Sequence, residues 1–489
     1  MVMKIPLEII NIADKLSANG YKSYLVGGCV RDMFLEKDPK DWDIATNAEP
    51  DEIQKIFPQS VYENSFGTVA VKTGSNKGSL KLIEITTFRS EGKYTDKRHP
   101  DEIKFAKTIE EDLSRRDFTI NAMALEVGFG SKAGDLIDPY KGGQDLSVKA
   151  IRCVGKAEER FSEDALRLMR AVRLATELKF SIEKETKNAI ERNSDLLGFI
   201  AKERIRDEFV RIVMASEAEK GLRLLEECCL VKNIIPELRE GIDCTQNKHH
   251  VYTVWEHGLL SLKYAASKNY SLEIRLAALL HDIGKPETKR GAGEDATFYS
   301  HEIVGAKMVY QILKDLRFSN EVVERVTHLV RYHLFYYNVG DVTEAGVRRF
   351  IKRVGLEYIP DLIKVREADR IGSGVPKAIP YKLRHLLFMI EKVKKDPISP
   401  KMLMIHGKEI MEIAGLKPSP KVGQILDILL DEVLEDPVKN NEKYLQDRVL
   451  VLSKKSKHEL EELQDKARDS KNEFEKGIEQ EIKGKYFVK

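Results

Sequence analysis

The sequence predicts an α+β protein, with a small α/β head at its N-terminal end followed by segments that are all helical. Strand-like alternation of apolar and polar residues is confined to about the first 150 residues, and helical periodicity replaces it after residue 155. At 489 residues the chain is too long for one core, so we expect about three or four domains. Its apolar runs are shorter than the roughly 18 residues that a membrane span needs, so no membrane partner is expected.

The head is predicted to comprise residues 1–150. Its first 16 residues carry acids among the apolar residues, which predicts an amphipathic helix and not a signal peptide. Segments rich in β-branched residues and bounded by turn residues predict strands at 24–26, 68–72, 80–88 and 102–105. The head is therefore expected to be a small sheet domain with helices between its strands.

Three helical regions are predicted after the head: a neck at 151–243, a histidine-rich region at 244–395 and a tail at 396–489. Proline-containing stretches at 376–380 and 396–400 are typical of linkers. The end of the tail is highly charged, yet apolar residues recur there every three or four positions, which favours a docked helix or helical hairpin over disorder. This stripe consists of Leu460, Leu463, Ala467, Phe474, Ile478 and Ile482.

Charge and cysteine content narrow the partners and the compartment. The net charge is only +2, so any nucleic-acid surface must be a local patch. The five cysteines form no C-x-x-C pair and no disulfide framework, which fits a reducing cytoplasm. The oligomeric state stays open at this point.

A candidate catalytic site lies in the head. The first predicted strand leads into Gly27-Gly28, and the helix that follows carries Arg31. The glycines let the backbone approach a phosphate, and the arginine can form paired hydrogen bonds with a triphosphate. Each element alone is more typical of a surface loop. Their order, with the acids that come next, favours nucleotide transfer.

The acids are Asp41 and Asp43, on an extended segment, and Glu84, on a later strand. Side chains two residues apart on a strand point the same way, so Asp41 and Asp43 suit a shared pair of hard cations such as Mg²⁺. Two such ions can activate an attacking hydroxyl and neutralise a leaving pyrophosphate. We therefore expect Asp41, Asp43 and Glu84 to be catalytic.

Four further motifs extend the pattern: Arg115 to Ala122, Asp138 to Leu146, Ser162 to Arg173, and Lys202 to Glu208. With the glycine and aspartate motifs they resemble, in order, the class II tRNA nucleotidyltransferase and bacterial poly(A) polymerase branch of the polymerase-β-like superfamily. The resemblance covers about residues 20–215 and implies a polymerase-β-like nucleotidyltransferase head. It also implies the nucleotide-binding residues Gly27, Gly28, Arg31, Arg115, Arg116, Asp117, Asn121, Asp164, Arg167, Arg170 and Arg173.

The resemblance implies that the motif from Ser162 to Arg173 reads the incoming base. Ser162 is expected to cap a helix on which Asp164, Arg167 and Arg170 share one face. A carboxylate beside a guanidinium can match the hydrogen-bonding edge of cytosine or adenine, and the resemblance gives that role to Asp164 and Arg167. Arg170 and Arg173 are expected to contact phosphates or to brace the site. A plain salt-bridge pair on a solvated helix is the alternative. The segment 88–96 is either the flexible loop of the resembling enzymes or an ordinary connection.

The second candidate site is a metal centre. Seven of the 11 histidines fall between residues 249 and 333, and an apolar helix ends in His281-Asp282. With His257 and Asp369 these residues resemble the H…HD…D metal site of the HD phosphohydrolase family. His301, His328 and His333 match the extra ligands of two-metal members. Such ligands suit Mn²⁺, Fe²⁺, Ni²⁺ or Mg²⁺.

The resemblance implies hydrolysis of phosphoesters at RNA ends, for example 2′,3′-cyclic phosphates, by this metal centre. Glu256 and Lys285 are candidate helpers beside the ligands. A domain that has lost its activity and is kept for structure is the alternative.

The resemblance also bears on the overall reaction. The segment 65–70 lacks the G-R-R element of the poly(A) polymerases, and 403–446 is similar to the tail unit that holds the tRNA elbow. We therefore expect addition of C, C and A to the 3′ end of tRNA from CTP and ATP. An A-adding enzyme, a CC-adding enzyme and a poly(A) polymerase are alternatives. A non-catalytic RNA-binding regulator is a weaker one, because Asp41 and Asp43 are both present. A protein whose main activity is that of the HD hydrolase, with the head as an RNA anchor, is a further alternative.

Overall fold

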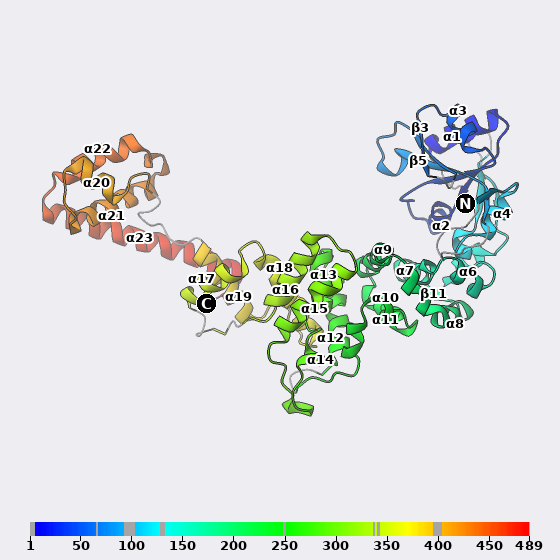
Figure 1. Cartoon of the computed structure of the whole chain (residues 1–489). Helices are drawn as coiled ribbons and strands as arrows, with labels where there is room; N and C mark the ends of the chain where they lie inside the picture. The colour runs from blue at the N-terminus through cyan, green and yellow to red at the C-terminus, as the bar shows by residue number, and fades with distance from the viewer. Residues whose placement is uncertain are drawn as a thin grey trace. The chain divides into compact units, whose positions relative to one another are not determined.

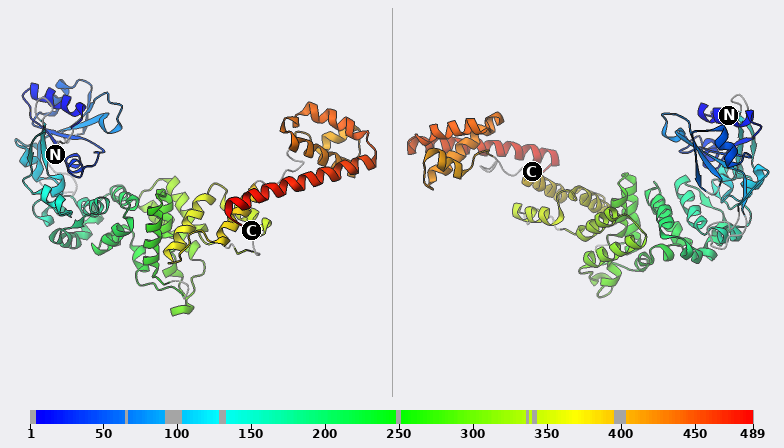
Figure 2. Two further views of the ribbon diagram at one scale, coloured as in Figure 1. Left: turned by 180° about the vertical axis from the view of Figure 1, so that it is seen from behind. Right: turned by 45° about the horizontal axis from the view of Figure 1, so that its top comes forward.

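The computed structural model (Figures 1 and 2) describes residues 5–64, 67–91, 103–127, 133–247, 251–335, 338–339, 343–394 and 403–488. The chain forms two compact units. The first comprises 1–334 and 361–376, and the second 335–360 and 377–489. A sheet occurs only in the first unit, within the described ranges, so the predicted α+β class is confirmed.

The head is built on a seven-stranded sheet with the order β3-β4-β5-β2-β1-β8-β9. The strands are β1 (Ser23–Val26), β2 (Asp43–Thr46), β3 (Ser60–Asn64), β4 (Thr68–Lys72), β5 (Leu82–Thr87), β8 (Ala124–Val127) and β9 (Ala133–Ile137). β2 and β5 are parallel, and the other neighbours are antiparallel. All four β1 residues are buried, which explains why Tyr24, Leu25 and Val26 form a continuous run without polar alternation.

The predicted strands at 24–26, 68–72 and 80–88 correspond to β1, β4 and β5. The fourth, at 102–105, corresponds to β7 (Ile103–Phe105), which pairs with β6 (Arg89–Glu91) in a separate two-stranded ribbon. Residues 92–96 of the predicted flexible loop (88–96), and residues 65–66 of the segment that argued against a poly(A) polymerase, lie outside the described ranges. The head also contains α1 (Leu7–Ala18), α2 (Gly28–Phe34), α3 (Pro50–Ile56), α4 (Ile109–Ser114) and α5 (Gly142–Ser147).

The neck follows the head as α6 (Ala157–Glu163), α7 (Leu166–Leu178), α8 (Lys184–Asn193), α9 (Lys202–Met214), α10 (Ala218–Glu227) and α11 (Val231–Ile234). The prediction that strands end near residue 155 was wrong. β11 (Ser181–Ile182) pairs in parallel with β10 (Ala150–Ile151). A two-residue strand is too short to produce a periodic signal, which is why the sequence did not reveal it.

The histidine-rich region contains α12 (Val254–Ser267), α13 (Leu272–Leu280), α14 (Lys285–Thr288), α15 (His301–Asp315), α16 (Asn320–Tyr332) and α18 (Ile359–Gly372). Two glycines let α12 approach its neighbours closely. A Cβ on Gly258 would lie 2.8 Å from the Leu279 carbonyl oxygen, and one on Gly372 would lie 2.2 Å from Ser261 Oγ. These close contacts place α12 against α13, which is followed directly by His281-Asp282, and against α18, which carries Asp369.

The second unit contains α17 (Glu344–Val354), α19 (Tyr381–Lys394), α20 (Gly407–Ala414), α21 (Pro420–Glu435), α22 (Glu442–Ser453) and α23 (Lys457–Tyr486). The end of the tail is a single 30-residue helix that starts at a Ser456–Glu459 capping box, so of the two predicted forms it is the helix. Leu460 and Ala467 are buried, whereas the side chains of Phe474, Ile478 and Ile482 lie outside the description. α17 and α19 belong to this unit, so the predicted boundary at residue 395 falls inside it.

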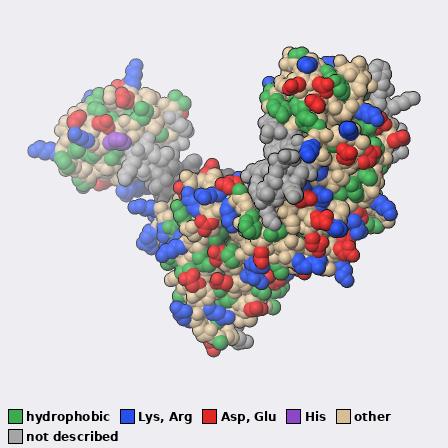
Figure 3. All heavy atoms as spheres, turned by 45° about the vertical axis from the view of Figure 1, so that its right-hand side comes forward, with side chains coloured by type: hydrophobic (Ala, Val, Ile, Leu, Met, Phe, Trp, Pro, Cys, Tyr) green, Lys and Arg blue, Asp and Glu red, His purple; other side chains and the backbone are tan. Residues whose placement is uncertain are grey.

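Surface charge and helix hydropathy are relevant to the predicted nucleic-acid and membrane partners. On the face drawn in Figure 3, basic side chains are interspersed with acidic ones, in keeping with the small net charge. Among the described helices, none is both long and apolar enough to cross a membrane. The described cysteines, Cys29, Cys153, Cys228, Cys229 and Cys244, are all free thiols.

Candidate functional site

The predicted catalytic acids meet at one end of the sheet. Asp43 is the first residue of β2, and its register partners are Val26 on β1 and Glu84 on β5. Burial raises the pKa of Asp43 to about 6, with further contributions from the like charges of Asp41 and Glu84. Asp41 and Glu84 are exposed to solvent. Asp43 thus lies between two negative charges that solvent can reach.

This acidic group fits a divalent cation. Three carboxylates placed together supply only oxygen ligands, which Mg²⁺ prefers. Burial raises the pKa of Asp43, the like charges of Asp41 and Glu84 add to the rise, and Arg116 opposes it. A bound cation would offset the repulsion among the three acids.

Gly27 is required at the turn between β1 and α2. It has φ 74° and ψ −133°, a region that side chains rarely adopt. A Cβ on this residue would lie 3.0 Å from Arg116 Nη1 and 3.6 Å from Asp43 Oδ2. The side chains of Arg116 and Asp43 therefore both lie against Gly27. A side chain on Gly27 would take the space beside them. A Cβ on Gly28 would lie 3.5 Å from Arg31 Nη2, so the guanidinium lies over the turn.

A hydrogen-bonded chain joins this turn to the neck. Arg31 Nη1 donates to Asn121 Oδ1 at 2.8 Å, and Asn121 Nδ2 donates to Asp117 Oδ1 at 3.2 Å. Arg170 of α7 donates to Asp117 Oδ2 from Nε at 2.9 Å and from Nη2 at 2.6 Å. Burial alone would raise the pKa of Asp117, but Arg170 outweighs it and holds that pKa well below its usual range. The predicted nucleotide-binding residues Arg31, Asp117, Asn121 and Arg170 thus form one network.

Arg115 and Arg116 share a buried partner that the sequence did not reveal. Arg115 donates to Asp112 Oδ1 from Nε at 3.0 Å and from Nη2 at 2.6 Å, and Arg116 Nη2 donates to Oδ2 at 3.1 Å. Burial would raise the pKa of Asp112, but the two arginines hold it below its ordinary value. The spacing of three and four residues along α4 was the available signal.

The local structure of the predicted base-reading motif differs from the prediction. Ser162 lies inside α6, which ends at Glu163, and Asp164 is extended, with φ −132° and ψ 104°. A new helix, α7, begins at Leu166, whose N–H donates to Asp164 Oδ1 at 3.0 Å. Ser162 is therefore not a cap, and Asp164 does not share a helical face with Arg167.

Asp164 and Arg167 lie on either side of this helix break and have different partners. Arg204 of α9 donates to Asp164 Oδ2 at 3.3 Å, and Arg167 Nη1 donates to Glu163 Oε2 at 2.7 Å. Arg167 Nη2 also reaches the Arg115 carbonyl oxygen, at 3.1 Å. The contact with Arg115 connects the motif to the head.

Arg173 is buried inside the neck. It is 4% exposed, and its Nε lies 3.0 Å from Glu208 Oε2 of α9. Burial lowers the pKa of Arg173 to about 10 and raises the pKa of Glu208. Of the two predicted roles for Arg173, this position favours bracing of α7 against α9 over contact with a phosphate.

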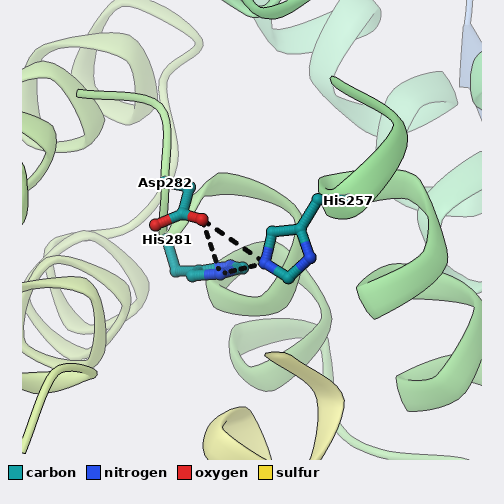
Figure 4. Close-up of side chains that lie close together, drawn as sticks. All are labelled: His257, His281 and Asp282. Carbon is teal, nitrogen blue, oxygen red and sulfur yellow. Dashed lines mark hydrogen bonds and ion pairs between the residues drawn. The ribbon is translucent and has the colours of Figure 1, made fainter. Parts of the chain in front are cut away.

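The metal centre brings together residues from five helices or their ends. His257 Nε2 lies 2.9 Å from His281 Nε2 and 3.3 Å from Asp282 Oδ2 (Figure 4). Asp369 Oδ1 of α18 lies 3.4 Å from His257 Nε2. On the other side, Asp282 Oδ1 lies 3.3 Å from His301 Nε2 and 3.7 Å from His333 Nε2. The two oxygens of Asp282 thus face two groups of histidines.

All six of these residues are buried. Five of them form two groups that share Asp282, and Asp369 lies beside the first group through its contact with His257. His328 lies outside both groups, with its ring 4.7 Å from that of Tyr332, so the structure does not support it as a ligand. Nδ1 of His281, His301 and His333 lies 2.7–3.0 Å from a carbonyl oxygen three residues earlier. That pairing assigns the proton to Nδ1 and leaves Nε2 free to bind a metal. The donor set therefore fits one or two divalent ions.

Burial and neighbouring charges shift the pKa values of the residues in this centre. Burial opposes protonation of His281, but Asp282 and Asp369 outweigh it and raise its pKa. Burial and the neighbouring His281 lower the pKa of His333 to about 3. The pKa values of Asp282 and Asp369 lie well below the ordinary range, because histidines and cationic side chains surround these buried carboxylates. The carboxylates are therefore ionised at neutral pH, as metal ligands must be.

Lys285 and Arg366 hold the acidic ligands. Lys285 Nζ lies 2.7 Å from Asp282 Oδ2 and 2.6 Å from Gln246 Oε1, and Arg366 pairs closely with Asp369. Glu256 instead pairs with Arg223 of α10 at 2.5 Å, so it does not serve the metal centre as predicted. No sequence pattern indicated a role for Gln246. A cavity of about 330 Å³ opens beside the ligands and is lined by Asp282, Lys285, Phe298, Tyr299, His301 and Arg366, among others.

Three family models match the chain. A poly(A) polymerase head domain matches residues 23–152, a probable RNA and SrmB-binding site of polymerase A matches 179–242, and an HD domain matches 250–373. The chain is 42% identical to a CCA-adding enzyme of Lactobacillus delbrueckii subsp. bulgaricus over 455 residues, which covers 90% of this chain and 96% of the relative.

Two further similarities complete the comparison. An A-adding tRNA nucleotidyltransferase of Deinococcus radiodurans is 35% identical over 68% of this chain and 76% of the relative. The crystal structure of the Bacillus stearothermophilus CCA-adding enzyme in complex with CTP superposes with a TM-score of 0.56 at 27% identity, covering 91% of this chain and 96% of that one.

Proposed function

Because the chain belongs to the family of CCA-adding enzymes, we propose that it adds C, C and A to the 3′ end of tRNA from CTP and ATP, releasing pyrophosphate. The observation that carries this proposal is the group formed by Asp41, Asp43 and Glu84 at the end of β2 and β5, beside the Gly27 turn. The near full-length relationship to CCA-adding enzymes supports the choice of acceptor and of both nucleotides.

The residues of the head have distinct roles in this proposal. Asp41, Asp43 and Glu84 would hold divalent cations, for which we propose Mg²⁺. When bound, such ions lower the pKa of the attacking 3′-hydroxyl and neutralise the leaving pyrophosphate. Arg31 and Arg116 lie over the Gly27-Gly28 turn, where they can bind the triphosphate. Asn121 and Asp117 form the network that connects this turn to the neck and are assigned to the ribose.

Base selection is assigned to the neck. Asp164 supplies a carboxylate acceptor and Arg167 supplies guanidinium donors, and the two lie on either side of the α6–α7 break. Arg170 and Arg173 are anchored by Asp117 and Glu208, so we assign them to bracing. The second unit is proposed to hold the tRNA body through its shape and phosphates, since every tRNA must be accepted.

We propose the domain limits 1–150 for the head, 151–243 for the neck, 244–395 for the HD domain and 396–489 for the tail. The family matches at 23–152, 179–242 and 250–373 support a head, a neck and an HD domain in this order, and the limit at 395 is not among the matched ends. A cytoplasmic location is proposed from the free cysteines and from the site of tRNA maturation.

The test is stepwise extension of a tRNA that lacks C-C-A. Purified protein is supplied with CTP alone, ATP alone or both, and the products are resolved at single-nucleotide length. The proposal expects two C residues with CTP and a further A when ATP is added. Failure to incorporate C would indicate an A-adding enzyme, a lack of A addition would indicate a CC-adding enzyme, and unlimited A addition to generic RNA would indicate a poly(A) polymerase. Absence of any incorporation would leave an RNA-binding regulator.

A second candidate activity is hydrolysis of phosphoesters by the HD centre. The observation that favours it is the meeting of six buried ligands beside a cavity lined by Lys285 and Arg366, whose charges suit a phosphate. The metal is proposed to be Mn²⁺, Ni²⁺ or Mg²⁺, which when bound can activate water. Release of phosphate or opening of a 2′,3′-cyclic phosphate by wild type, and its loss in His281→Ala, tests this activity. Equal rates in the two proteins would exclude it.

A further inference from the structure

The buried carboxylate of Asp112 accepts a hydrogen bond from Arg116, the arginine that lies beside the acidic group of Asp41, Asp43 and Glu84. Asp112 on α4 is 1% exposed, and both of its oxygens are engaged by neighbouring arginines. Oδ1 accepts from Arg115, and Oδ2 accepts from Arg116 at 3.1 Å. Oδ1 also lies 3.3 Å from the main-chain N–H of Arg89, the first residue of β6. One carboxylate thus fixes two arginines and the base of the β6–β7 ribbon.

Arg116 reaches from this anchor toward the acids. Its Nη2 is held by Asp112, while its Nη1 lies at the Gly27 turn, on the side of Asp43. The Arg116 side chain is 19% exposed. Its buried Nε has no hydrogen-bond partner within the described part of the chain. Arg116 therefore retains donors and a positive charge within reach of the metal-binding acids.

An arginine in this position has an alternative partner. Without a restraint, its guanidinium would pair with Asp43, because opposite charges beside each other at a partly buried site attract strongly. That ion pair would occupy the oxygens that a divalent cation needs. The ionised Asp112 carboxylate opposes this pairing in two ways, by holding Nη2 in place and by neutralising part of the arginine charge.

We propose that Asp112 is a positioning residue that keeps Arg116 off Asp43, so that the acidic group stays available to divalent cations. Arg116 is then presented to the nucleotide phosphates and does not close the metal site. The inference rests on the nucleotidyl transfer proposed for the head. It can nevertheless be tested without tRNA or nucleotide, because it concerns the binding of a cation by the protein.

The experiment measures Mn²⁺ binding to the full-length protein by electron paramagnetic resonance. Asp43→Asn, run in parallel, identifies the ions that bind in the head as distinct from those in the HD centre. We expect Asp112→Asn to weaken head-site binding about tenfold, the effect of a change of about 1.4 kcal/mol. The double variant Asp112→Asn/Arg116→Gln should recover wild-type Mn²⁺ affinity, because the competing cation is gone.

Two further variants separate positioning from a general loss of stability. Asp361→Asn removes a carboxylate that accepts from Arg325 Nε and Nη2 at 3.1 and 2.5 Å in the helical region, and it should leave head-site Mn²⁺ binding unchanged. Arg116→Gln alone keeps Asp112 and stays informative if Asp112→Asn does not fold. It should bind Mn²⁺ at least as tightly as wild type.

The proposal is overturned if Asp112→Asn binds Mn²⁺ like wild type, if the double variant stays as weak as the single one, or if Arg116→Gln weakens binding. None of these outcomes bears on the proposed function, which fails only if wild-type protein extends no tRNA. In the extension assay, Asp112→Asn should also need about tenfold more Mg²⁺ for half-maximal C addition. Saturating Mg²⁺ should restore the rate more fully than saturating CTP.

Discussion

The proposed metal sites of the head and of the HD centre differ in how their surroundings act on the acids. In the head, Asp41 and Glu84 are exposed, and burial together with these two charges raises the pKa of Asp43 to about 6. In the HD centre, Asp282 and Asp369 are buried among histidines, Lys285 and Arg366, and their pKa values are strongly lowered. The head therefore needs a cation to neutralise it, whereas the HD centre is already close to neutral.

This difference fits the proposed chemistry of each site. A triphosphate brings its own divalent cation, so a site that is open and deficient in positive charge can bind nucleotide and metal together. A phosphoester hydrolase benefits from a resident metal held by buried imidazoles. Independent changes to the two sites should therefore have independent effects.

The largest effect expected is on tRNA extension. Asp43→Asn should lower the rate of C addition about a thousandfold, the upper range for removal of one group that stabilises transition-state charge. It should leave HD-dependent phosphoester hydrolysis unchanged, and His281→Ala should have the reverse pattern. Single-turnover extension and phosphate release measure the two rates. Parallel loss of both activities in either variant would show that the sites are coupled.

Asp43→Asn should also stabilise the metal-free protein against unfolding. The raised pKa of Asp43 means that the folded state binds its proton more tightly than the unfolded state, so the ionised group destabilises the fold above pH 6. Asp43→Asn should therefore increase the unfolding free energy at pH 8 by about 3 kcal/mol, from a pKa shift of about two units. This gain should shrink as the pH falls through 6 and disappear below pH 4. Denaturant melts of both proteins across this range measure it, and a gain independent of pH would contradict it.

The folding stability of the HD centre should increase when metal binds and decrease in acid, whereas the metal-free head should become more stable in acid. Mn²⁺ at a hundred times its Kd should stabilise the wild-type domain by about 2.7 kcal/mol, and His281→Ala should lose this effect. Because the pKa of His333 is lowered to about 3, this ring favours the folded state above pH 6.5, and that contribution is lost as the pH falls. Thermal melts with and without Mn²⁺ at pH 7.5 and 5 check both points. Because Asp282 and Asp369 raise the pKa of His281, this ligand is protonated at pH 5, so stabilisation by Mn²⁺ that is as large at pH 5 as at pH 7.5 would contradict ligation by a neutral imidazole.

A smaller effect is expected at the base-reading site. Arg204 donates to Asp164 Oδ2, so Arg204→Ala should free this carboxylate to rotate. We expect discrimination against UTP and GTP to fall about tenfold, within the range that one pocket contact contributes. Misincorporation rates on a tRNA that lacks C-C-A measure it. Lys187→Ala, which removes an exposed neck ion pair to Glu227, is the control and should leave discrimination intact.

Much of the fold and of the two candidate sites could be predicted from the sequence. The family and the α+β class were predicted and are confirmed, because glycine, aspartate and histidine motifs depend on local chemistry that the residue string preserves. The break between α6 and α7 was missed, since Ser162 to Arg173 contains no proline or glycine to mark it. Asp112, Gln246 and Arg204 were missed for a different reason. Their roles arise from partners that only the fold or a precise helical turn brings together.

The smallest effect should come from Glu256, which precedes the predicted ligand His257 but belongs to neither group of candidate metal ligands. Its carboxylate pairs with Arg223, and both side chains are about one-third exposed. An exposed pair of this kind contributes less than about 1 kcal/mol. Glu256→Gln should therefore change neither Mn²⁺ affinity nor hydrolysis, and it should lower the unfolding free energy by no more than that amount. Lys285→Met is the contrasting variant, because it removes the buried partner of Asp282 and should impair hydrolysis strongly. A Glu256→Gln variant as impaired as Lys285→Met would show that Glu256 serves the metal centre after all.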